Sequence, residues 1–375
     1  MQCSGEMTFL TLDGSHGEGG GQILRTALSL SATTGRAFRL INVRAGRADP
    51  GLMPQHLSAV RAAATICGAV VVGDQLGSTE LTFAPSRSPE AGSYLFDVAE
   101  LSGRGSAGSA TLLLQTLLVP LAFADGVSTV VLRGGTHVAW SPPFDHVVGS
   151  YLPMLRRMGL HVDADLTQWG WYPVGQGEIV CRIGAAAHIE RTRLNRVELL
   201  AREPLRRVAG RAVAANLPAH VAQRMADRAR TSLGDLGVPV RIEPQRVTAA
   251  CPGAGIFLVA EYGDLDVAFS AYGRLGKPSE AVADEAVGVL REHHASKAAV
   301  ELHLADQLLL PAALASGVST FTTPKPTGHL RTNAWTIGQF GIADVSIEEG
   351  TPCRVRVDPH DWQPHTAATS TQSAG

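Results

Sequence analysis

A glycine-rich turn near the N-terminus places one carboxylate among glycines, just before an apolar helix is expected. The turn runs from Gly17 to Gln22. Glycines let backbone N–H groups approach an anion, and the N-terminus of the following helix adds positive potential. Glu18 would repel a phosphate held there unless a divalent cation lies between them. If the turn binds phosphate, Glu18 is therefore expected to be a metal ligand; otherwise it only favours the helix start.

Arginines lie close to this turn in the sequence. Arg25 falls in the first turns of the expected helix, and Arg44 and Arg47 lie on the glycine-containing loop after a β-type stretch at 38–43. Guanidinium groups bind phosphate oxygens through paired N–H donors, so these residues are candidate phosphate contacts. Arg39, within the β-type stretch, is a weaker candidate. The alternative is a solvated loop in an arginine-rich chain.

A loop histidine and two polar residues of a late apolar helix form a third group of candidates. His329 lies in the loop, and Asp306 and Gln307 lie on the helix. A histidine can act as base or nucleophile when a carboxylate orients its ring, and Asp306 could do so. Other histidines near the same kinds of loop leave the choice of histidine open at this point. They are His16, His56, His137 and His303.

Three segments repeat one order of elements that would carry these residues. Each is an apolar helix stopped by a glycine, followed by a β-type stretch, a polar or glycine/proline loop and a second helix. The helical segments span residues 22–35, 111–126 and 304–317. In this alignment Arg47, His137 and His329 occupy equivalent loops. We therefore expect the three loops to meet at one face.

The third repeat begins about 100 residues later in the sequence than the spacing of the first two repeats predicts, and this extra length is that of a small domain. The pattern predicts an α/β (α+β) fold in which three repeated βαβα-type units form a large discontinuous domain at 1–183 and 277–357. A smaller α/β domain is expected to be inserted at 184–276, before the third unit. The polar tail at 358–375 is expected to be disordered.

Composition narrows the classes of protein. The chain has 375 residues, 45% hydrophobic and 18% charged, with a net charge of −2, so it is globular and carries no basic coat for nucleic acid. Its five cysteines are scattered and form no CxxC pair, which argues against a disulfide framework or a structural zinc site. With no long apolar run and no signal-type N-terminus, a soluble cytoplasmic protein without a membrane partner is expected.

Taken together, these residues resemble the RNA 3′-terminal phosphate cyclase family. Four stretches carry the resemblance, at 12–26, 43–56, 304–311 and 329–333. It covers nearly the whole chain except the tail and is weakest in the inserted segment. The resemblance implies three repeated βαβα-type units with an inserted smaller domain, which agrees with the late third repeat.

The resemblance also implies the reaction. Members use ATP and a divalent cation, Mg or Mn, to convert an RNA 3′-phosphate end into a 2′,3′-cyclic phosphate through a histidine–AMP adduct and an RNA-adenylate. It implies that His329 carries AMP, that Glu18 binds the metal, and that no obligate protein partner is needed. The implied phosphate contacts are Arg25, Arg44, Arg47 and Gln55. The implied nucleotide contacts are Gln115, Pro143, His303, Asp306 and Gln307.

Two departures and three alternatives accompany this resemblance. His303 stands where members often carry an adenine-stacking tyrosine, and Gly328 stands where some carry cysteine.

A non-catalytic cyclase-like scaffold for RNA processing would lack the nucleotidyl histidine that this chain has. An enolpyruvyl transferase would rely on lysines, but the first of only three lysines here is Lys277. A general nucleic-acid-binding module would show a basic stripe or interleaved aromatic residues.

Overall fold

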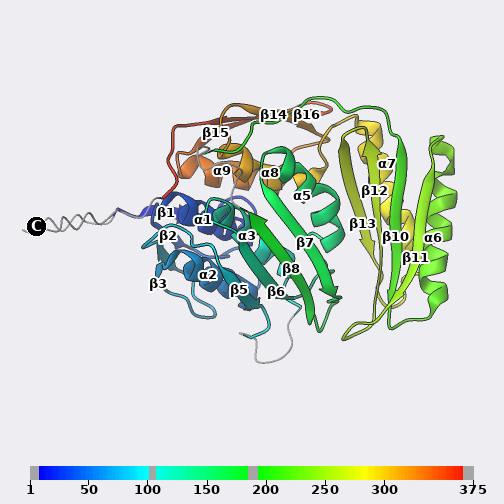
Figure 1. Cartoon of the computed structure of the whole chain (residues 1–375), viewed down its shortest axis with the longest axis horizontal. Helices are drawn as coiled ribbons and strands as arrows, with labels where there is room; N and C mark the ends of the chain where they lie inside the picture. Colours follow the sequence, from blue (N-terminus) through cyan, green and yellow to red (C-terminus); the bar gives the residue numbers. More distant parts are fainter. Residues whose placement is uncertain (1–7, 101–106, 185–192, 366–375) are drawn as a thin grey trace, which may run out of the picture.

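The computed structural model describes residues 8–100, 107–184 and 193–365. Three sheets of these residues share one strand order, which accounts for the sequence repeat (Figure 1). In each sheet the first strand pairs in parallel with the second, and the fourth pairs antiparallel with both the second and the third. Each unit therefore extends the expected βαβα order by two strands. The expected mixed α/β fold is confirmed.

The first unit contains the glycine-rich turn between its first strand and first helix. It consists of β1 (Leu10–Asp13), α1 (Gly21–Thr34), β2 (Phe38–Ile41), α2 (Pro54–Cys67), β3 (Val70–Val72) and β4 (Leu81–Ala84). Helix α1 ends before Gly35, as expected, because this glycine adopts a left-handed φ of 75° and donates its N–H to the Ser31 carbonyl. The turn and the Arg44 loop therefore lie at the ends of two parallel neighbouring strands.

The second unit differs from the sequence prediction at the end of its first helix. It consists of β5 (Ser93–Asp97), α3 (Ala110–Ala122), β6 (Ser128–Gly134), α4 (Phe144–His146), the π-helix η1 (Val147–Tyr151), α5 (Leu152–Arg157), β7 (His161–Gln168) and β8 (Gly177–Gly184). Helix α3 ends at Ala122, with Phe123 as its C-cap and not Gly126, and contains Pro120 in its last turn. A proline donates no N–H and disrupts the preceding turn, so the helix stops soon after it. The expected glycine stop is wrong here.

The third unit is interrupted after its first strand. It consists of β9 (Glu198–Leu199), α8 (Leu302–Ala313), β14 (Ser319–Thr323), α9 (Gly328–Gln339), β15 (Ala343–Glu348) and β16 (Cys353–Pro359). Helix α8 also ends shortly after an internal proline, Pro311, and not at Gly317. Strand β9 pairs in parallel with β14 although the inserted segment separates them in the sequence.

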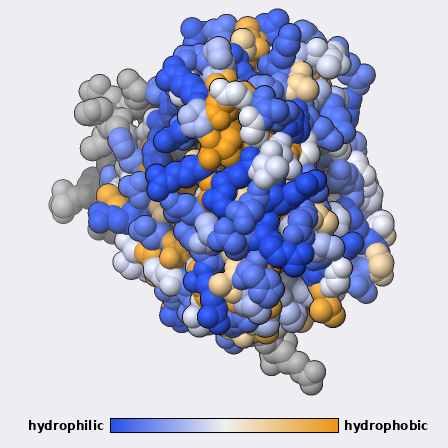
Figure 2. Space-filling model, turned by 90° about the vertical axis from the view of Figure 1, so that its right-hand side faces the viewer, coloured by the Kyte–Doolittle hydropathy of each residue, from blue (hydrophilic) through white to orange (hydrophobic). Residues whose placement is uncertain are grey.

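The inserted segment forms the fourth sheet, in the order β11-β10-β12-β13. It consists of β10 (Arg207–Ala215), α6 (Ala219–Leu233), the 3-10 helix η2 (Gly234–Leu236), β11 (Val240–Val247), β12 (Gly253–Tyr262), β13 (Leu265–Tyr272) and α7 (Ser279–Ser296). Helices α6 and α7 pack on each other and on the strands, and β13 contacts η1 of the second unit. Figure 2 views the molecule from the side of α6 and shows a largely hydrophilic surface on which small hydrophobic patches are scattered.

The predicted domain limits of 184 and 276 stay a prediction. Because β9 belongs to the third sheet and α7 packs on β12 and β13, we propose 200 and 298 as the limits of the inserted segment. In the predicted tail, residues 366–375 lie outside the described part of the chain. Residues 358–365 of the predicted tail were expected to be disordered but are ordered, because β16 continues to Pro359 and Trp362 is only 5% exposed.

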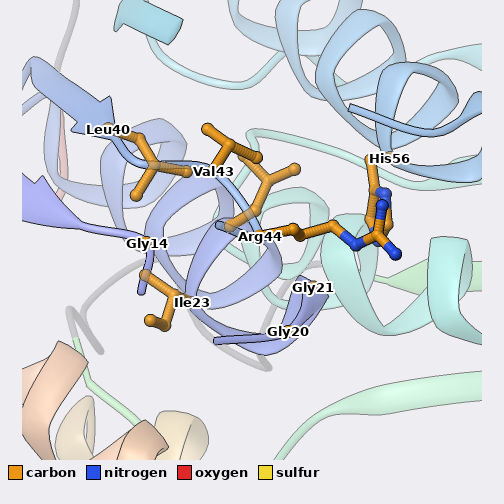
Figure 3. A pocket seen from close by; sticks show the side chains of 9 residues that line it. Gly14, Gly20, Gly21, Ile23, Leu40, Val43, Arg44 and His56 are labelled. Carbon is orange, nitrogen blue, oxygen red and sulfur yellow. The ribbon is translucent and has the colours of Figure 1, made fainter. Parts of the chain in front are cut away.

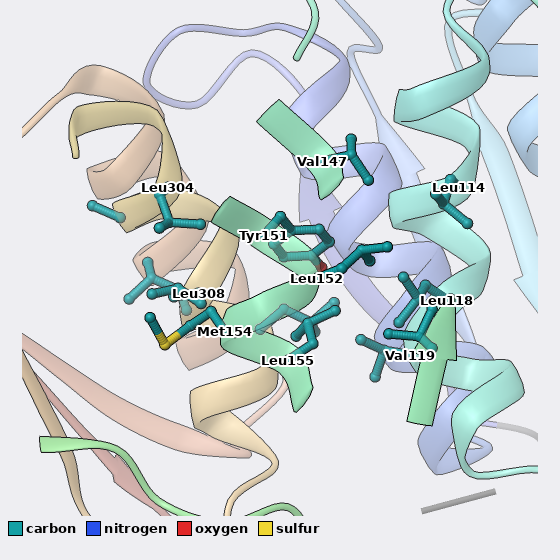
Figure 4. Packing of buried hydrophobic residues seen from close by; sticks show 14 of the residues in the cluster. Leu114, Leu118, Val119, Val147, Tyr151, Leu152, Met154, Leu155, Leu304 and Leu308 are labelled. Carbon is teal, nitrogen blue, oxygen red and sulfur yellow. The ribbon is translucent and has the colours of Figure 1, made fainter. Parts of the chain in front are cut away.

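The core holds the helices that carry the candidate residues. Figure 4 shows η1 and α5 between α8 and α3, with Met154 on the side of Leu308 and Leu155 on the side of Val119. Helix α1 contacts α2, α3 and α9, and α8 contacts α9. The N-terminal part of α1 and helices α8 and α9 are therefore fixed relative to one another. Among the described residues, no helix is long and apolar enough to cross a membrane.

Candidate active site

The N-terminus of α9 presents His329. The helix begins at Gly328, directly after Thr327, whose Oγ1 accepts the backbone N–H of Leu330 at 3.0 Å. This capping bond satisfies one of the free N–H groups of the first turn and fixes where the helix starts. His329 is consequently the second helical residue, and its side chain is half-exposed. The imidazole can therefore meet a ligand from solvent while its backbone is held.

Glu18 of the glycine-rich turn contacts this histidine. Its Oε2 lies 3.0 Å from His329 Nδ1. Burial lowers the pKa of His329; Glu18 opposes this shift, while Arg25, His303 and Arg47 add to it. The imidazole is therefore neutral at pH 7, and the nearby Glu18 carboxylate favours the tautomer that carries its proton on Nδ1 and its lone pair on Nε2. The carboxylate that orients the ring is Glu18, so the expectation for Asp306 is wrong.

The backbone of Glu18 is held on both sides. Its N–H donates to Thr332 Oγ1 at 3.3 Å, and its carbonyl accepts Arg47 Nη2 at 3.0 Å. A Cβ built on Gly20 would lie 3.2 Å from Arg47 Nη2, so this close crossing of the turn favours glycine. A Cβ on Gly328 would lie 2.1 Å from Glu18 Oε1, so the glycine before His329 provides the space that the glutamate occupies.

Arg25 is a partly buried cation beside the turn. Its Nη2 donates to Gln22 Oε1 at 3.0 Å. Desolvation lowers its pKa to about 10, against the attraction of Asp306, so it remains charged at neutral pH. A partly buried cation whose hydrogen-bond partner among the described residues is a neutral amide favours an anion nearby. This placement suits the expected phosphate contact.

A pocket lies between the glycine-rich turn and the loop after β2 (Figure 3). Gly20, Gly21, Arg44 and His56 are among its lining residues, and Figure 3 shows the Arg44 side chain directed toward the His56 ring. Arg44 Nη1 already donates to the carbonyls of Asp49 at 2.7 Å and Gly51 at 3.1 Å. Burial, with Arg25 and Arg44 nearby, lowers the pKa of His56 to about 3, so this ring is neutral.

Helix α8 contributes a second histidine, His303, which is charged where His329 is neutral. His303 Nδ1 lies 2.7 Å from Oε1 of Glu301, which is only 4% exposed. The other oxygen of Glu301 accepts the N–H groups of His303 and Leu304 and so caps the helix. The hydrogen bond and charge of Glu301 raise the pKa of His303 to about 9. His303 is therefore a cation on the side of α8 that faces His329.

Asp306 and Gln307 continue this side of the site. Burial raises the pKa of Asp306 to about 7, against the charges of His303 and Arg25. Gln307 Oε1 lies 3.1 Å from Nε2 of His146, which follows Pro143 in the second unit. Burial lowers the pKa of His146, so its neutral ring can donate to Gln307. The second and third units are thus joined next to the proposed nucleotide contacts.

Three of the residues implied by the resemblance lie further from His329. Gln55 is in the first turn of α2, Gln115 is on α3, and Pro143 precedes α4. Within the described ranges, no hydrogen bond joins them to His329. Gln115 Nε2 is buried without a hydrogen-bond partner. Buried amide groups are normally satisfied, so this donor is consistent with a place for a polar ligand atom.

Glu18 could contribute to a cation site only together with other oxygen donors. In the part of the chain that the structure describes, no three His, Cys, Asp or Glu residues are grouped so as to hold a metal ion. Mg²⁺ commonly uses one or two carboxylates with phosphate oxygens and water. The Glu18 carboxylate therefore fits a cation that arrives with a nucleotide, and not a cage made by the protein alone.

Two sequence candidates lie outside this site. Arg39 forms an exposed ion pair with Glu80 on the sheet. His137 is buried, and its Nε2 lies 2.8 Å from Asp145 Oδ2. The His137 side chain is enclosed by aromatic rings of the second unit and the inserted sheet. The expectation that the three loops meet at one face stays a prediction.

Sequence reasoning missed Thr332 and Trp335, which contact the glycine-rich turn from α9, and Glu301, which sets the charge of His303. It named His16 only among the candidate histidines near the loops, without its contact to Trp335. One signal was available: Thr332 and Trp335 lie at helical spacing from His329 and Gly328. Which loop they would contact could not be read from that spacing.

Comparisons with known proteins agree with this geometry. The sequence model of a family described as RNA 3′-terminal phosphate cyclase matches residues 16–347. The RNA 3′-terminal phosphate cyclase of Methylococcus capsulatus is 52% identical, over 91% of this chain and 93% of its own length. Those of Gloeothece citriformis and Archaeoglobus fulgidus are 50% and 40% identical, over 90% and 88% of this chain and 95% of each relative.

Among solved structures, the enolpyruvyl transferase NikO of Streptomyces tendae matches 48% of this chain and 33% of its own, with 15% identity and a TM-score of 0.26. This likeness is too small to bear on fold or function. The family match spans both sides of the site, including Glu18 and His329. The chain therefore belongs to the RNA 3′-terminal phosphate cyclase family.

Proposed function

We propose that this protein converts RNA 3′-phosphate ends into 2′,3′-cyclic phosphates at the expense of ATP, and that His329 carries AMP during the reaction. The contact between Glu18 and His329 is the observation that supports this most directly. It leaves Nε2 of a neutral imidazole free at the rim of a cationic site. A neutral imidazole attacks phosphorus and later leaves it, which suits a carrier of a nucleotidyl group.

In the first step, the Nε2 lone pair attacks the α-phosphorus of ATP. The bond from this phosphorus to the α,β-bridging oxygen breaks, and pyrophosphate leaves. The imidazole ring gains positive charge because Nδ1 keeps its proton. Glu18 stabilises that charge because its carboxylate oxygen lies 3.0 Å from Nδ1, as an orienting carboxylate does for a nucleophile or base of this type.

Two further steps complete the reaction. An oxygen of the RNA 3′-phosphate attacks the same phosphorus, and the bond to Nε2 breaks. The neighbouring 2′-hydroxyl then attacks the 3′-phosphorus and loses its proton, and AMP leaves with the former phosphate oxygen. Adenylylation is required because a phosphate monoester has no good leaving group of its own. Covalent catalysis thus divides one difficult displacement into easier ones.

The residues around His329 supply the binding groups in this proposal. Arg25 and Arg47 flank the turn and suit the phosphates, and Arg44 extends this set into the pocket. Gln55, in the first turn of α2, is assigned to the same set. The nucleotide is assigned to Gln115, Pro143, His303, Asp306 and Gln307. A divalent cation held by Glu18 would neutralise phosphate charge when bound.

The test is a labelling experiment without RNA. The purified protein is incubated with ATP labelled at the α-phosphate and a divalent cation, and then denatured. We expect an adduct that is labile in acid and stable in alkali, as for a phosphoramidate, and that is lost in His329→Ala. His360→Ala is the matched control, because His360 pairs with Asp344 on the third sheet, away from the site.

Two results would contradict the assignment. Labelling that persists in His329→Ala would place AMP on another residue. Absence of label on folded wild-type protein that is free of bound AMP would favour the non-catalytic scaffold for RNA processing.

The cation assignment has its own test. Glu18→Ala should raise the Mg²⁺ or Mn²⁺ concentration needed for half-maximal adenylylation, because one carboxylate ligand is removed. The rate of adduct formation is measured against ion concentration, with Glu349→Gln as a control on an exposed ion pair. An unchanged ion dependence in Glu18→Ala would show that Glu18 acts on His329 alone.

A further inference from the structure

The glycine-rich turn lies along one stripe of helix α9. Glu18 lies beside Gly328 and His329, Gly17 lies against Thr332, and His16 lies against Trp335. Residues 328, 332 and 335 are spaced so that they share one face of a helix. From Glu18 back to His16, each residue of the turn therefore contacts a residue further along α9.

The outer contact of this series is aromatic. The rings of His16 and Trp335 stack with centroids 4.0 Å apart and planes 14° from parallel. His16 is exposed, and Trp335 is partly buried against the core. The tryptophan is thus held by the body of the protein, and the histidine is the part that the turn brings to it.

The turn needs such an anchor because of its own glycines. Gly17 and Gly19, on either side of Glu18, have φ values of 59° and 56°. Glycine adopts this conformation without strain but also leaves it readily. Thr332 Oγ1 accepts the Glu18 N–H and Arg47 donates to the Glu18 carbonyl, whereas the backbone of His16 bonds within the turn itself, to Asp13 and Gly19.

We propose that His16 and Trp335 form an aromatic clamp that keeps the glycine-rich turn in register on α9 and so positions Glu18 against His329. Both are positioning residues for the adenylylation step, and this role rests on the proposed function of His329. The clamp acts through Glu18, because the Glu18–His329 contact is the next one along the same stripe. Loss of the stack lets the turn shift while the ATP-binding arginines and α8 stay in place.

Single-turnover adenylylation at saturating ATP tests the clamp, since its rate constant does not depend on the active fraction of the protein. His16→Ala and Trp335→Ala should lower this rate constant about tenfold or more, because small displacements of reacting groups are costly. The ATP concentration for half-saturation should change little. His16→Phe and Trp335→Phe keep a stacked pair and should restore most of the rate.

Arg331→Ala is the matched control. Arg331 lies on the same helix, is exposed, and pairs with Glu349 on another side. It should leave the rate constant unchanged. If Arg331→Ala and His16→Ala slow the reaction equally, the effect is general to α9 and the clamp is refuted.

Comparing His16→Ala in the wild type and in Glu18→Ala separates loss of Glu18 positioning from a general loss of structure. In Glu18→Ala, the group that the clamp is proposed to position is gone, so adding His16→Ala should cost little more. An equal loss in both backgrounds would overturn the proposal that His16 acts through Glu18.

Hydrogen exchange tests the clamp without using activity. Backbone amides of residues 14–20 should exchange faster in His16→Ala and Trp335→Ala than in wild type or Arg331→Ala. Unchanged exchange would refute the clamp even if the wild type formed no adduct. A wild type without adduct but with faster exchange in the variants would contradict the assigned chemistry and support the anchored turn.

Discussion

Burial and neighbouring charges give the histidines of the candidate site different protonation states. His56 and His329 are neutral at pH 7 because burial and nearby arginines lower their pKa values, His56 to about 3. His303 is charged because Glu301 raises its pKa to about 9. A neutral nucleophile beside a fixed cation suits attack on an anionic phosphate, since the cation attracts the phosphate without protonating the nucleophile.

The charge on His303 predicts a pH-dependent contribution to stability. Its pKa is raised from 6.5 to about 9 in the folded protein. The stabilisation is therefore fully present below about pH 6.5 and is lost as pH rises through about 9. The groups that face His303 are Glu301 and Asp306 on α8, His146 from α4 and His329 from α9.

The measurement is thermal unfolding of wild type and His303→Gln across this pH range. The difference in Tm should be largest near about pH 6 and should shrink toward about pH 10. His360→Gln, which removes an exposed pair with Asp344, should give a smaller difference. A His303 difference that stays constant with pH would show that the histidine contributes by packing and not by charge.

At the scale of elements, the start of α9 is what brings His329 to the site. Its first turn carries free N–H groups and a partial positive charge, which favour a phosphate near the nucleophile. Thr327 satisfies one of these groups and fixes the start of the helix. The glycine-rich turn then lies along the helix, so the position of that start also decides which residue meets Glu18.

The cap predicts a combined effect on stability and rate. Thr327→Ala should lower the free energy of unfolding by about 1 kcal/mol, since the bond to the Leu330 N–H is lost. The single-turnover adenylylation rate constant should fall as well, because the first turn frays at His329. Denaturant unfolding and labelling at saturating ATP measure the two. Thr327→Ser keeps the hydroxyl and should restore both; a rate constant unaffected by Thr327→Ala would show that His329 is held by Glu18 alone.

At the scale of the whole molecule, a partly buried ion pair joins the inserted sheet to the second unit. Arg211 of β10 donates from Nε and Nη2 to Asp145 at 2.7 and 2.9 Å, and its guanidinium stacks on Trp169 at 4.7 Å. Burial raises the pKa of Asp145, but hydrogen bonds from His137 and Arg211 outweigh this and hold it below its usual value. Asp145 lies two residues after Pro143, so the bridge connects the inserted sheet to the proposed nucleotide side.

Removing the arginine should be costly because it leaves a partly buried carboxylate with one partner. We expect Arg211→Ala to lower the free energy of unfolding by about 2 kcal/mol. Arg207→Ala on the same strand breaks only an exposed pair with Glu261 and should cost at most about 1 kcal/mol. Denaturant unfolding compares them. Equal, small losses would mean that water replaces Arg211 and that the inserted sheet is not held through this bridge.

Much of the architecture followed from local patterns. The apolar helices, the β-type stretches and the late third repeat follow from hydrophobic period and spacing, which each segment carries in itself. The β-type stretch expected at 38–43 contains strand β2 (Phe38–Ile41), and α1 ends directly before Gly35 as expected. The predicted glycine ends of the helices in the second and third repeats are wrong, because these helices end soon after Pro120 and Pro311, before the glycines.

The sequence by itself determined the repeated units, the candidate residues and the family resemblance, since motifs and periods are local. Only the tertiary structure decided that Glu18, and not Asp306, meets His329, that His137 is enclosed elsewhere, and that Glu301 charges His303. The physical reason is that these contacts join loops and helices far apart in the chain. Their burial sets the pKa values, and burial is a property of the packed molecule.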